Sequence, residues 1–235
     1  MHIFADSLAA AFHLVLTADA MLVEIVLRSL KVSLTALALS ALIGLPLGAV
    51  LAVTRFRLRG AVMVFINALM GLPPVVVGLV VYLFLSRSGP LGWMGLLYTP
   101  TAMIIAQAIL ITPILTALST QILEDMNDEY SEMFASLSVP RPTAIGTLLI
   151  DARFALLTVI LAGFGRAVSE VGAVIIVGGN IDHLTRVMTT AIALETSKGD
   201  LALALGLGIV LLTIALAVNA ASVAMKSSMM RRAYG

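Results

Sequence analysis

Four stretches of this sequence are long enough to cross a lipid bilayer and contain no charged residue. The hydrocarbon core of a bilayer is about 30 Å thick, so a helix of roughly 20 apolar residues crosses it. A fifth stretch is equally apolar apart from Arg166 and Glu170 near its middle. Because unpaired backbone amides are costly in hydrocarbon, all five are predicted to be helices. The uncharged stretches are residues 32–54, 60–86, 101–123 and 201–225, and the fifth is residues 154–181.

The composition agrees with lipid as the main solvent of the chain. Hydrophobic residues make up 60% of the 235 residues and charged residues only 11%, whereas a soluble domain has about 25% charged residues. The net charge of +1 gives no reason to expect a nucleic-acid partner. We therefore predict an all-α, polytopic membrane protein with about five transmembrane helices.

Residues 1–21 have two interpretations. On a helix, Asp6, His13 and Thr17 fall on one face and Phe12 falls on the other. This pattern is typical of a helix that lies in the membrane interface, although a short extra span also fits. The segment has no basic start and contains acidic residues, so it does not resemble a cleaved signal peptide.

Basic residues in short loops predict the orientation, because such residues are concentrated on the cytoplasmic side. Three groups fall on one side of the predicted spans: Arg55, Arg57 and Arg59, then Arg141 and Arg153, and finally Lys226, Arg231 and Arg232. The other side receives Arg87, Arg186 and Lys198, with Arg28 and Lys31 near the outer end of the first span. We expect a multi-pass inner-membrane protein whose C-terminus, a basic tail over residues 226–235, is cytoplasmic.

The loop over residues 124–153 is the longest segment on the predicted cytoplasmic side. Five of its first nine residues are acidic, and they are followed by the apolar run 133–137 and by Pro140-Arg141-Pro142. The pattern predicts a short amphipathic helix parallel to the membrane, which the prolines stop because proline cannot continue a helix. Such a helix is expected to dock against something other than lipid.

Arg166 and Glu170 are expensive inside a span, at about 2.5 kcal/mol or more each, so they are expected to face the protein interior or a water-filled path. Their spacing of four residues allows them to pair. One interpretation is a buried structural ion pair that sets helix register. The other is a translocation pathway in which Arg166, Ser169 and Glu170 meet a passing anion.

Other polar and small residues have mainly structural interpretations. Asn67, Thr112 and Thr116 could line a route for an anion, but hydrogen bonds to their own or neighbouring helices are more common. Gly44 and Gly48 have the spacing that brings helices close together, and Pro46, Pro73, Pro74 and Pro113 are expected to break or kink their spans, through packing or as a hinge.

No enzyme motif is present in the sequence. There is no cysteine, no H-E-x-x-H and no phosphate-binding G-x-x-x-x-G-K-S/T, and the three histidines, His2, His13 and His183, are far apart. We therefore expect no catalytic residue and no metal site, and a chain that cannot hydrolyse ATP by itself.

The loop over residues 124–153 and three further blocks of the sequence resemble a known family, the permeases of binding-protein-dependent ABC importers. The cytoplasmic loop aligns Glu132-Met133-Phe134, Ser138 and Leu148-Leu149-Ile150-Asp151 with that family's loop motif, in which two alanines, a glycine and a proline differ. Residues 72–78, with their double proline, and residues 163–173 are similar to the molybdate, sulfate and tungstate permeases. The segments Gly178-Gly179-Asn180-Ile181, 185–192 and 195–200 are most similar to the tungstate-specific members.

The resemblance implies a type I ABC importer permease fold over residues 22–225. It implies a homodimer bound to two cytoplasmic ATPase subunits, which hold the ATP and Mg²⁺, and an extracytoplasmic binding protein that delivers an oxyanion. Tungstate is the first expectation, with molybdate or sulfate as alternatives. The residues expected to couple the permease to the ATPase are Glu132, Ala135, Ser138, Pro140 and Arg141.

A passive anion channel, or another multi-helix membrane protein without an ATPase, is the alternative function. A channel also carries cations and small polar residues along its pore. It does not need a long cytoplasmic loop with a docking helix, so that loop favours an importer driven by alternating access between two states.

Overall fold

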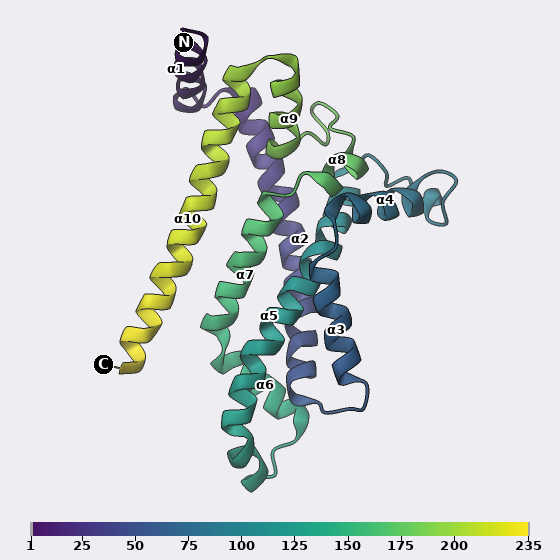
Figure 1. Cartoon of the computed structure of the whole chain (residues 1–235), viewed down its shortest axis with the longest axis vertical. Coiled ribbons are helices and arrows are strands. Elements are labelled where there is room, and N and C mark those ends of the chain that lie inside the picture. Colours follow the sequence, from purple (N-terminus) through teal and green to yellow (C-terminus); the bar gives the residue numbers. More distant parts are fainter. Residues whose placement is uncertain (1, 235) are drawn as a thin grey trace. The chain divides into compact units, whose positions relative to one another are not determined.

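The computed structural model describes the backbone of residues 2–234 and the side chains of residues 6–224. Within these residues the chain is helical and has no β-strand, which confirms the all-α fold (Figure 1). The helices are α1 (His2–Leu16), α2 (Ala20–Val53), α3 (Arg59–Met70), α4 (Pro74–Leu85), the 3-10 helix η1 (Gly92–Met94), α5 (Pro100–Ser136), α6 (Arg141–Asp151), α7 (Arg153–Val168), α8 (Gly172–Gly178), α9 (Met188–Lys198) and α10 (Leu201–Tyr234).

Three helices are long and apolar enough to cross a membrane, namely α2, α5 and α10 over residues 201–224. Two further candidates are helix pairs interrupted by a short break, α3 with α4 and α6 with α7. The described residues therefore contain three to five spans, in agreement with the predicted number. The basic tail over residues 226–235 continues α10 as far as Tyr234, and its side chains lie outside the described ones.

Polar side chains begin the three long helices. Oδ1 of Asp19 accepts hydrogen bonds from the backbone N–H groups of Met21 and Leu22, and Oδ1 of Asp200 accepts one from Leu203. The hydroxyl oxygen of Thr99 accepts one from Ala102 in the first turn of α5. These oxygens satisfy N–H groups that have no partner inside the helix.

The predicted span at residues 60–86 is broken rather than continuous. Helix α3 ends at Met70, Pro73 has an extended backbone (φ −62°, ψ 124°), and α4 begins at Pro74. The residue before a proline is disfavoured in helical geometry, and proline has no N–H to continue the helix. Pro73 and Pro74 thus break their span as predicted, whereas Pro46 and Pro113 lie inside the continuous helices α2 and α5.

The fifth predicted span, residues 154–181, is also not one helix. Helix α7 ends at Val168 and the seven-residue helix α8 begins at Gly172. Glu170 therefore lies in the break between the two helices. The hydropathy of this segment does not show the break, because Arg166, Ser169 and Glu170 are isolated in an otherwise apolar sequence over residues 159–179.

The chain packs as two compact units. Unit 1 contains the residues up to 36, 73–107 and 165–218, and unit 2 contains 37–72, 108–164 and the residues from 219. In unit 1, a Cβ added at Gly78 of α4 would lie 2.7 Å from Cα of Ala173, so these two helices touch through their backbones. In the same unit, Ala11 of the 15-residue helix α1 packs near Gly206 at the start of α10. Whether α1 lies on the membrane or enters it stays a prediction.

In unit 2, α2 packs closely on α5. A Cβ added at Gly48 would lie 2.1 Å from Oγ of Ser119 and 2.9 Å from the carbonyl oxygen of Thr116, and one at Gly44 would lie 3.2 Å from the carbonyl oxygen of Thr112. Small residues at this spacing let two helix backbones approach. The packing interpretation of Gly44 and Gly48 therefore has direct structural support.

The loop over residues 124–153 does not contain the separate short helix that was predicted. Its acidic residues continue α5 without interruption to Ser136, and the chain then turns at Ser138, whose φ is +49°. Pro140 precedes α6 and Pro142 lies in its first turn. The prolines thus begin a new helix instead of stopping the old one, because residues in a first helical turn need no N–H partner inside the helix.

Helix α6 folds back along the end of α5 (Figure 1). Leu148 of α6 and Leu123 of α5 are fully buried in one apolar cluster, which also contains Ala152 and residues 49 and 52 of α2. Tyr130 and Phe134 of α5 pack at the edge of this cluster, with ring centroids 5.7 Å apart in a T-shaped arrangement. Apolar burial on one side explains why α5 continues so far beyond its apolar part.

Candidate functional site

The first candidate site is the break between α7 and α8 in unit 1. Arg166 donates a hydrogen bond from Nη1 to Oε2 of Glu170, so the two side chains form the ion pair that their spacing predicts. The Glu170 side chain is 3% exposed and that of Arg166 is 34% exposed. The carboxylate is therefore buried, while part of the guanidinium group remains accessible.

Side chains from other helices satisfy the backbone groups at this break. Nε2 of Gln107 in α5 donates to the carbonyl oxygen of Ala167 at 3.0 Å, and the hydroxyl of Thr189 in α9 donates to the carbonyl oxygen of Glu170 at 2.8 Å. Oε1 of Glu170 accepts a hydrogen bond from the N–H of Ala173 at 3.1 Å. Irregular backbone is tolerated inside a membrane protein only where such partners exist. Hydrogen bonds from α5 and α9 therefore stabilise the break within unit 1.

The small polar residues predicted near a pathway are engaged locally. The Ser169 hydroxyl donates to the carbonyl oxygen of Gly165 at 2.9 Å, and those of Thr112 and Thr116 donate to carbonyl oxygens one turn earlier in α5. These bonds agree with the structural interpretation of the threonines. Asn67 lines a cavity of about 390 Å³ in unit 2, together with Gln121, Glu124 and Asp125.

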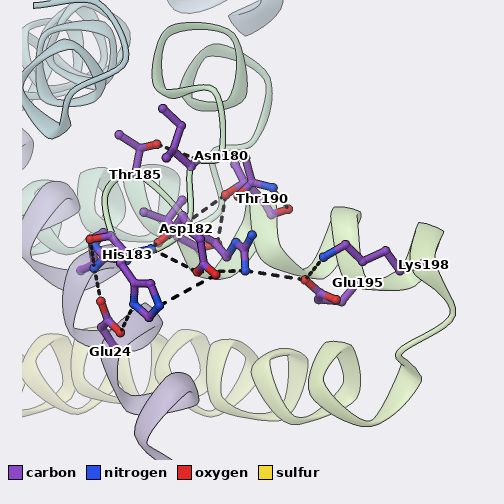
Figure 2. Close-up of polar contacts among 12 residues, drawn as sticks. Glu24, Asn180, Asp182, His183, Thr185, Thr190, Glu195 and Lys198 are labelled. Atoms are coloured by element: carbon purple, nitrogen blue, oxygen red, sulfur yellow. Dashed lines mark hydrogen bonds and ion pairs between the residues drawn. The ribbon is translucent and has the colours of Figure 1, made fainter.

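A second polar cluster in unit 1 was not anticipated from the sequence. Arg186 is 11% exposed, and its Nη1 lies 3.0 Å from Oδ1 of Asp182 and 3.9 Å from Oε1 of Glu195 (Figure 2). Glu195 also pairs with Lys198 at 3.0 Å. The spacing of Asp182 and Arg186, four residues apart, was the available signal, but Glu195 meets Arg186 only through the fold.

Arg28 attaches this cluster to α2. Its guanidinium group pairs with Glu24 and donates to the backbone carbonyl oxygens of His183 at 2.8 Å and Arg186 at 3.4 Å. Glu24 also lies 2.9 Å from Nδ1 of His183 (Figure 2). Arg28, which was expected near the outer end of the first span, and Arg186, which was expected as a loop charge, thus hold the segment 180–187 in place.

The same segment is supported from within. The hydroxyl of Thr185 donates to the carbonyl oxygen of Gly178 at 2.5 Å and accepts from the N–H of Ile181 at 2.9 Å. Nδ2 of Asn180 donates to the carbonyl oxygen of Thr190 at 3.2 Å. This loop carries part of the sequence block that resembles the tungstate-specific permeases, and hydrogen bonds hold it within unit 1.

The second candidate site is the turn between α5 and α6 in unit 2. All five residues predicted to couple the protein to an ATPase lie here and are exposed: Glu132, Ala135, Ser138, Pro140 and Arg141. Three large apolar side chains on the two helices and the turn are exposed as well, Met133, Leu137 and Ile150. The buried side of the α5–α6 pair is apolar, so the exposed side is left for solvent or a partner.

Ion pairs fix the base of this pair of helices. Nη2 of Arg59 lies 2.8 Å from Oε2 of Glu124, and Nε of Arg59 donates to the carbonyl oxygen of Leu51 at 2.9 Å. Arg55 lies 3.3 Å from Asp128. Part of the acidic run therefore neutralises neighbouring arginines, and Glu132 lies beyond these pairs toward the turn.

Comparison with known proteins assigns the chain to a family. The family described as "Binding-protein-dependent transport system inner membrane component" matches residues 44–231. A tungstate uptake system permease protein from Peptoclostridium acidaminophilum is 42% identical over 94% of this chain and 96% of its own length. A probable anion ABC transporter permease from Haloferax volcanii is 44% identical over 85% and 88% of the two chains.

A tungstate uptake system permease from Campylobacter jejuni is 40% identical over 70% of this chain and 69% of its own length. These relatives are transport permeases, which agrees with the absence of an enzyme motif in the sequence. The matched region includes both candidate sites and most of the apolar helices. The chain belongs to the family of inner-membrane components of binding-protein-dependent transport systems.

Proposed function

We propose that this chain is the membrane permease of an ABC importer that brings tungstate into the cytoplasm. The observation that carries the proposal is the 42% identity, over 94% of this chain, with a permease whose name states tungstate uptake. A molybdenum transport permease from Azotobacter vinelandii is 28% identical over 64% of the chain, so molybdate is the second candidate substrate.

The working importer contains two copies of this chain, two ATPase subunits on the cytoplasmic side and an extracytoplasmic binding protein. ATP and Mg²⁺ bind to the ATPase subunits. The chain itself contains no G-x-x-x-x-G-K-S/T sequence, so the energy has to come from such a partner. The C-terminus of α10 faces the cytoplasm, since the basic residues of the sequence favour that side.

The ATPase binds the exposed turn between α5 and α6. Glu132, Ala135 and Ser138 lie on it beside exposed Leu137, and the apolar cluster behind them joins the turn to the rest of unit 2. When the ATPase moves, the turn and the helices packed on it in unit 2 therefore move together. Alternating access requires two such states, one of which the nucleotide stabilises.

The transported anion passes beside the break between α7 and α8. The accessible part of the Arg166 guanidinium group offers positive charge to a dianion, and the carboxylate of Glu170 limits how tightly that anion is held. Ser169, which is exposed next to this pair, lies on the same pathway.

Uptake by cells lacking their own tungstate and molybdate permeases tests the proposal. The chain, expressed with its partner ATPase and binding protein, is expected to raise cellular tungsten, measured by mass spectrometry, and an ATPase variant unable to hydrolyse ATP is expected to abolish the rise. Tungsten accumulation without a functional ATPase would indicate a passive channel. Accumulation of molybdenum or sulfate, but not tungsten, would reassign the substrate.

A further inference from the structure

A small polar cavity lies in unit 1 beside the break between α7 and α8. Its lining includes Ser29 and Ser33 of α2, Gln107 of α5 and Thr189 of α9, together with Glu170 from the break itself. The cavity has a volume of about 10 Å³, which is the space that one water molecule requires. Its size excludes an oxyanion, so it is not part of a pathway for the transported substrate.

Gln107 presents an unpaired oxygen at this cavity. The residue is 3% exposed, and its Nε2 donates to the carbonyl oxygen of Ala167. A carbonyl oxygen can only accept, so this bond also decides which end of the amide is the nitrogen. The other end, Oε1, is buried and has no hydrogen-bond partner within the described part of the chain. A buried amide oxygen in that state is strongly destabilising unless a ligand donates to it.

The serines of α2 supply two further polar groups. Oγ of Ser29 accepts a hydrogen bond from the N–H of Met188 at 2.6 Å, and this bond does not use the hydroxyl proton of Ser29. Ser33 lies one turn further along α2 and is 3% exposed. The cavity thus combines an acceptor that needs a donor with hydroxyl groups that can both donate and accept.

We propose that this cavity holds one bound water molecule. The water donates a hydrogen bond to Oε1 of Gln107 and exchanges hydrogen bonds with the hydroxyls of Ser29 and Ser33. Buried waters make about three hydrogen bonds to groups that otherwise lack partners, and this set of side chains provides that number. The amide of Gln107 then links the water to the carbonyl oxygen of Ala167 near the end of α7.

A metal ion fits the cavity less well than water. Calcium and magnesium ions take about six or more oxygen ligands, which is more than the lining side chains provide. The charge of Glu170, the acidic residue at the cavity, is already balanced by Arg166. The neutral groups that remain suit a neutral ligand.

A density map of the purified protein in lipid nanodiscs, at about 2 Å resolution or better, tests the proposal directly. We expect one isolated peak about 2.6 to 3.2 Å from Oε1 of Gln107 and from a serine hydroxyl. An empty cavity overturns the proposal. A peak with clearly shorter contacts, present in sodium buffer and absent in choline buffer, also overturns it and identifies a cation instead.

Two variants at one position provide an independent test. Ser33→Thr adds a methyl group that occupies the space of the water and leaves Gln107 unpaired, so we expect the Tm to fall by about 3 °C or more. Ser33→Ala is the control, since it leaves room for the water and is expected to cost less. If the cavity is dry, the order reverses and Ser33→Thr is the more stable variant, which overturns the proposal. Neither measurement uses transport, so both stand apart from the proposed function.

Discussion

The break between α7 and α8 and the turn between α5 and α6 both carry charged residues where a helix ends. The two regions differ in how far those residues are exposed to solvent. At the break, Glu170 is buried, and backbone groups of Ala167, Glu170 and Ala173 have side-chain partners. At the turn, Glu132 and Arg141 are exposed. A charge inside the protein is retained only with partners, whereas a charge on the surface is free to serve a second protein. Substitutions at the break should therefore lower stability as well as transport, whereas substitutions at the turn should affect transport alone.

The largest effect on stability is expected from removing one half of the buried pair. Glu170→Leu leaves Arg166 without its partner and takes away the acceptor for the Ala173 N–H group, and it should cost about 3 kcal/mol. Thermal unfolding of the detergent-solubilised protein measures this loss.

The double variant Arg166→Leu with Glu170→Leu is the matched control, and it should recover part of that stability because no charge remains unpaired. Tungstate uptake by the double variant then tests the pathway. If the double variant assembles and transports at the normal rate, Arg166 and Glu170 are structural only.

The turn should show the reverse behaviour. Glu132→Lys is expected to abolish uptake while changing the free energy of unfolding by no more than about 0.5 kcal/mol, because the side chain is exposed. Ala135→Pro should also abolish uptake, since it disrupts the last turn of α5. Membrane insertion should be normal in both.

Asp6→Lys, a charge reversal at an exposed residue of α1, serves as the control for Glu132→Lys. It should leave uptake unchanged. Co-purification with the ATPase subunit identifies the cause, because Glu132→Lys should lose the ATPase and Asp6→Lys should keep it. Normal transport by both loop variants would remove this turn as the coupling surface.

A smaller loss of stability is expected at Thr189, which supports the break through one hydroxyl group. Thr189→Val keeps the shape of the side chain but removes the donor to the carbonyl oxygen of Glu170, and it should cost about 1 to 3 kcal/mol. Thr213→Val in α10 is the control, because that threonine is exposed and bonds only to its own helix. Equal unfolding temperatures for the two variants would show that the break does not depend on this bond.

The smallest effect is expected at the surface pair near the turn. Arg55 and Asp128 lie 3.3 Å apart, with side chains 82% and 59% exposed. Arg55→Ala should change the free energy of unfolding by no more than about 0.5 kcal/mol, because water and salt screen such pairs. A loss as large as that of Glu170→Leu would contradict the contrast between the two regions.

Short-range patterns in the sequence were enough to predict the all-α membrane fold, most of its spans and one of its breaks. Long uncharged stretches identified the spans, because the cost of placing polar groups in lipid is summed over neighbouring residues. The double proline at residues 73–74 predicted a break, because its effect is confined to one turn of backbone. The Arg166 and Glu170 pair followed from a spacing of four residues.

Only the tertiary structure decided the rest, because it depends on residues that are distant in sequence. Leu148 of α6 is buried against Leu123, and that contact accompanies the continuation of α5 through the acidic residues, where a separate short helix was expected. Gln107 meets Ala167 across 60 residues, and Ser29 meets Met188 across 159. Hydropathy and spacing measure the preference of a segment for lipid or for helix. Which polar groups become partners is decided by how the helix faces pack.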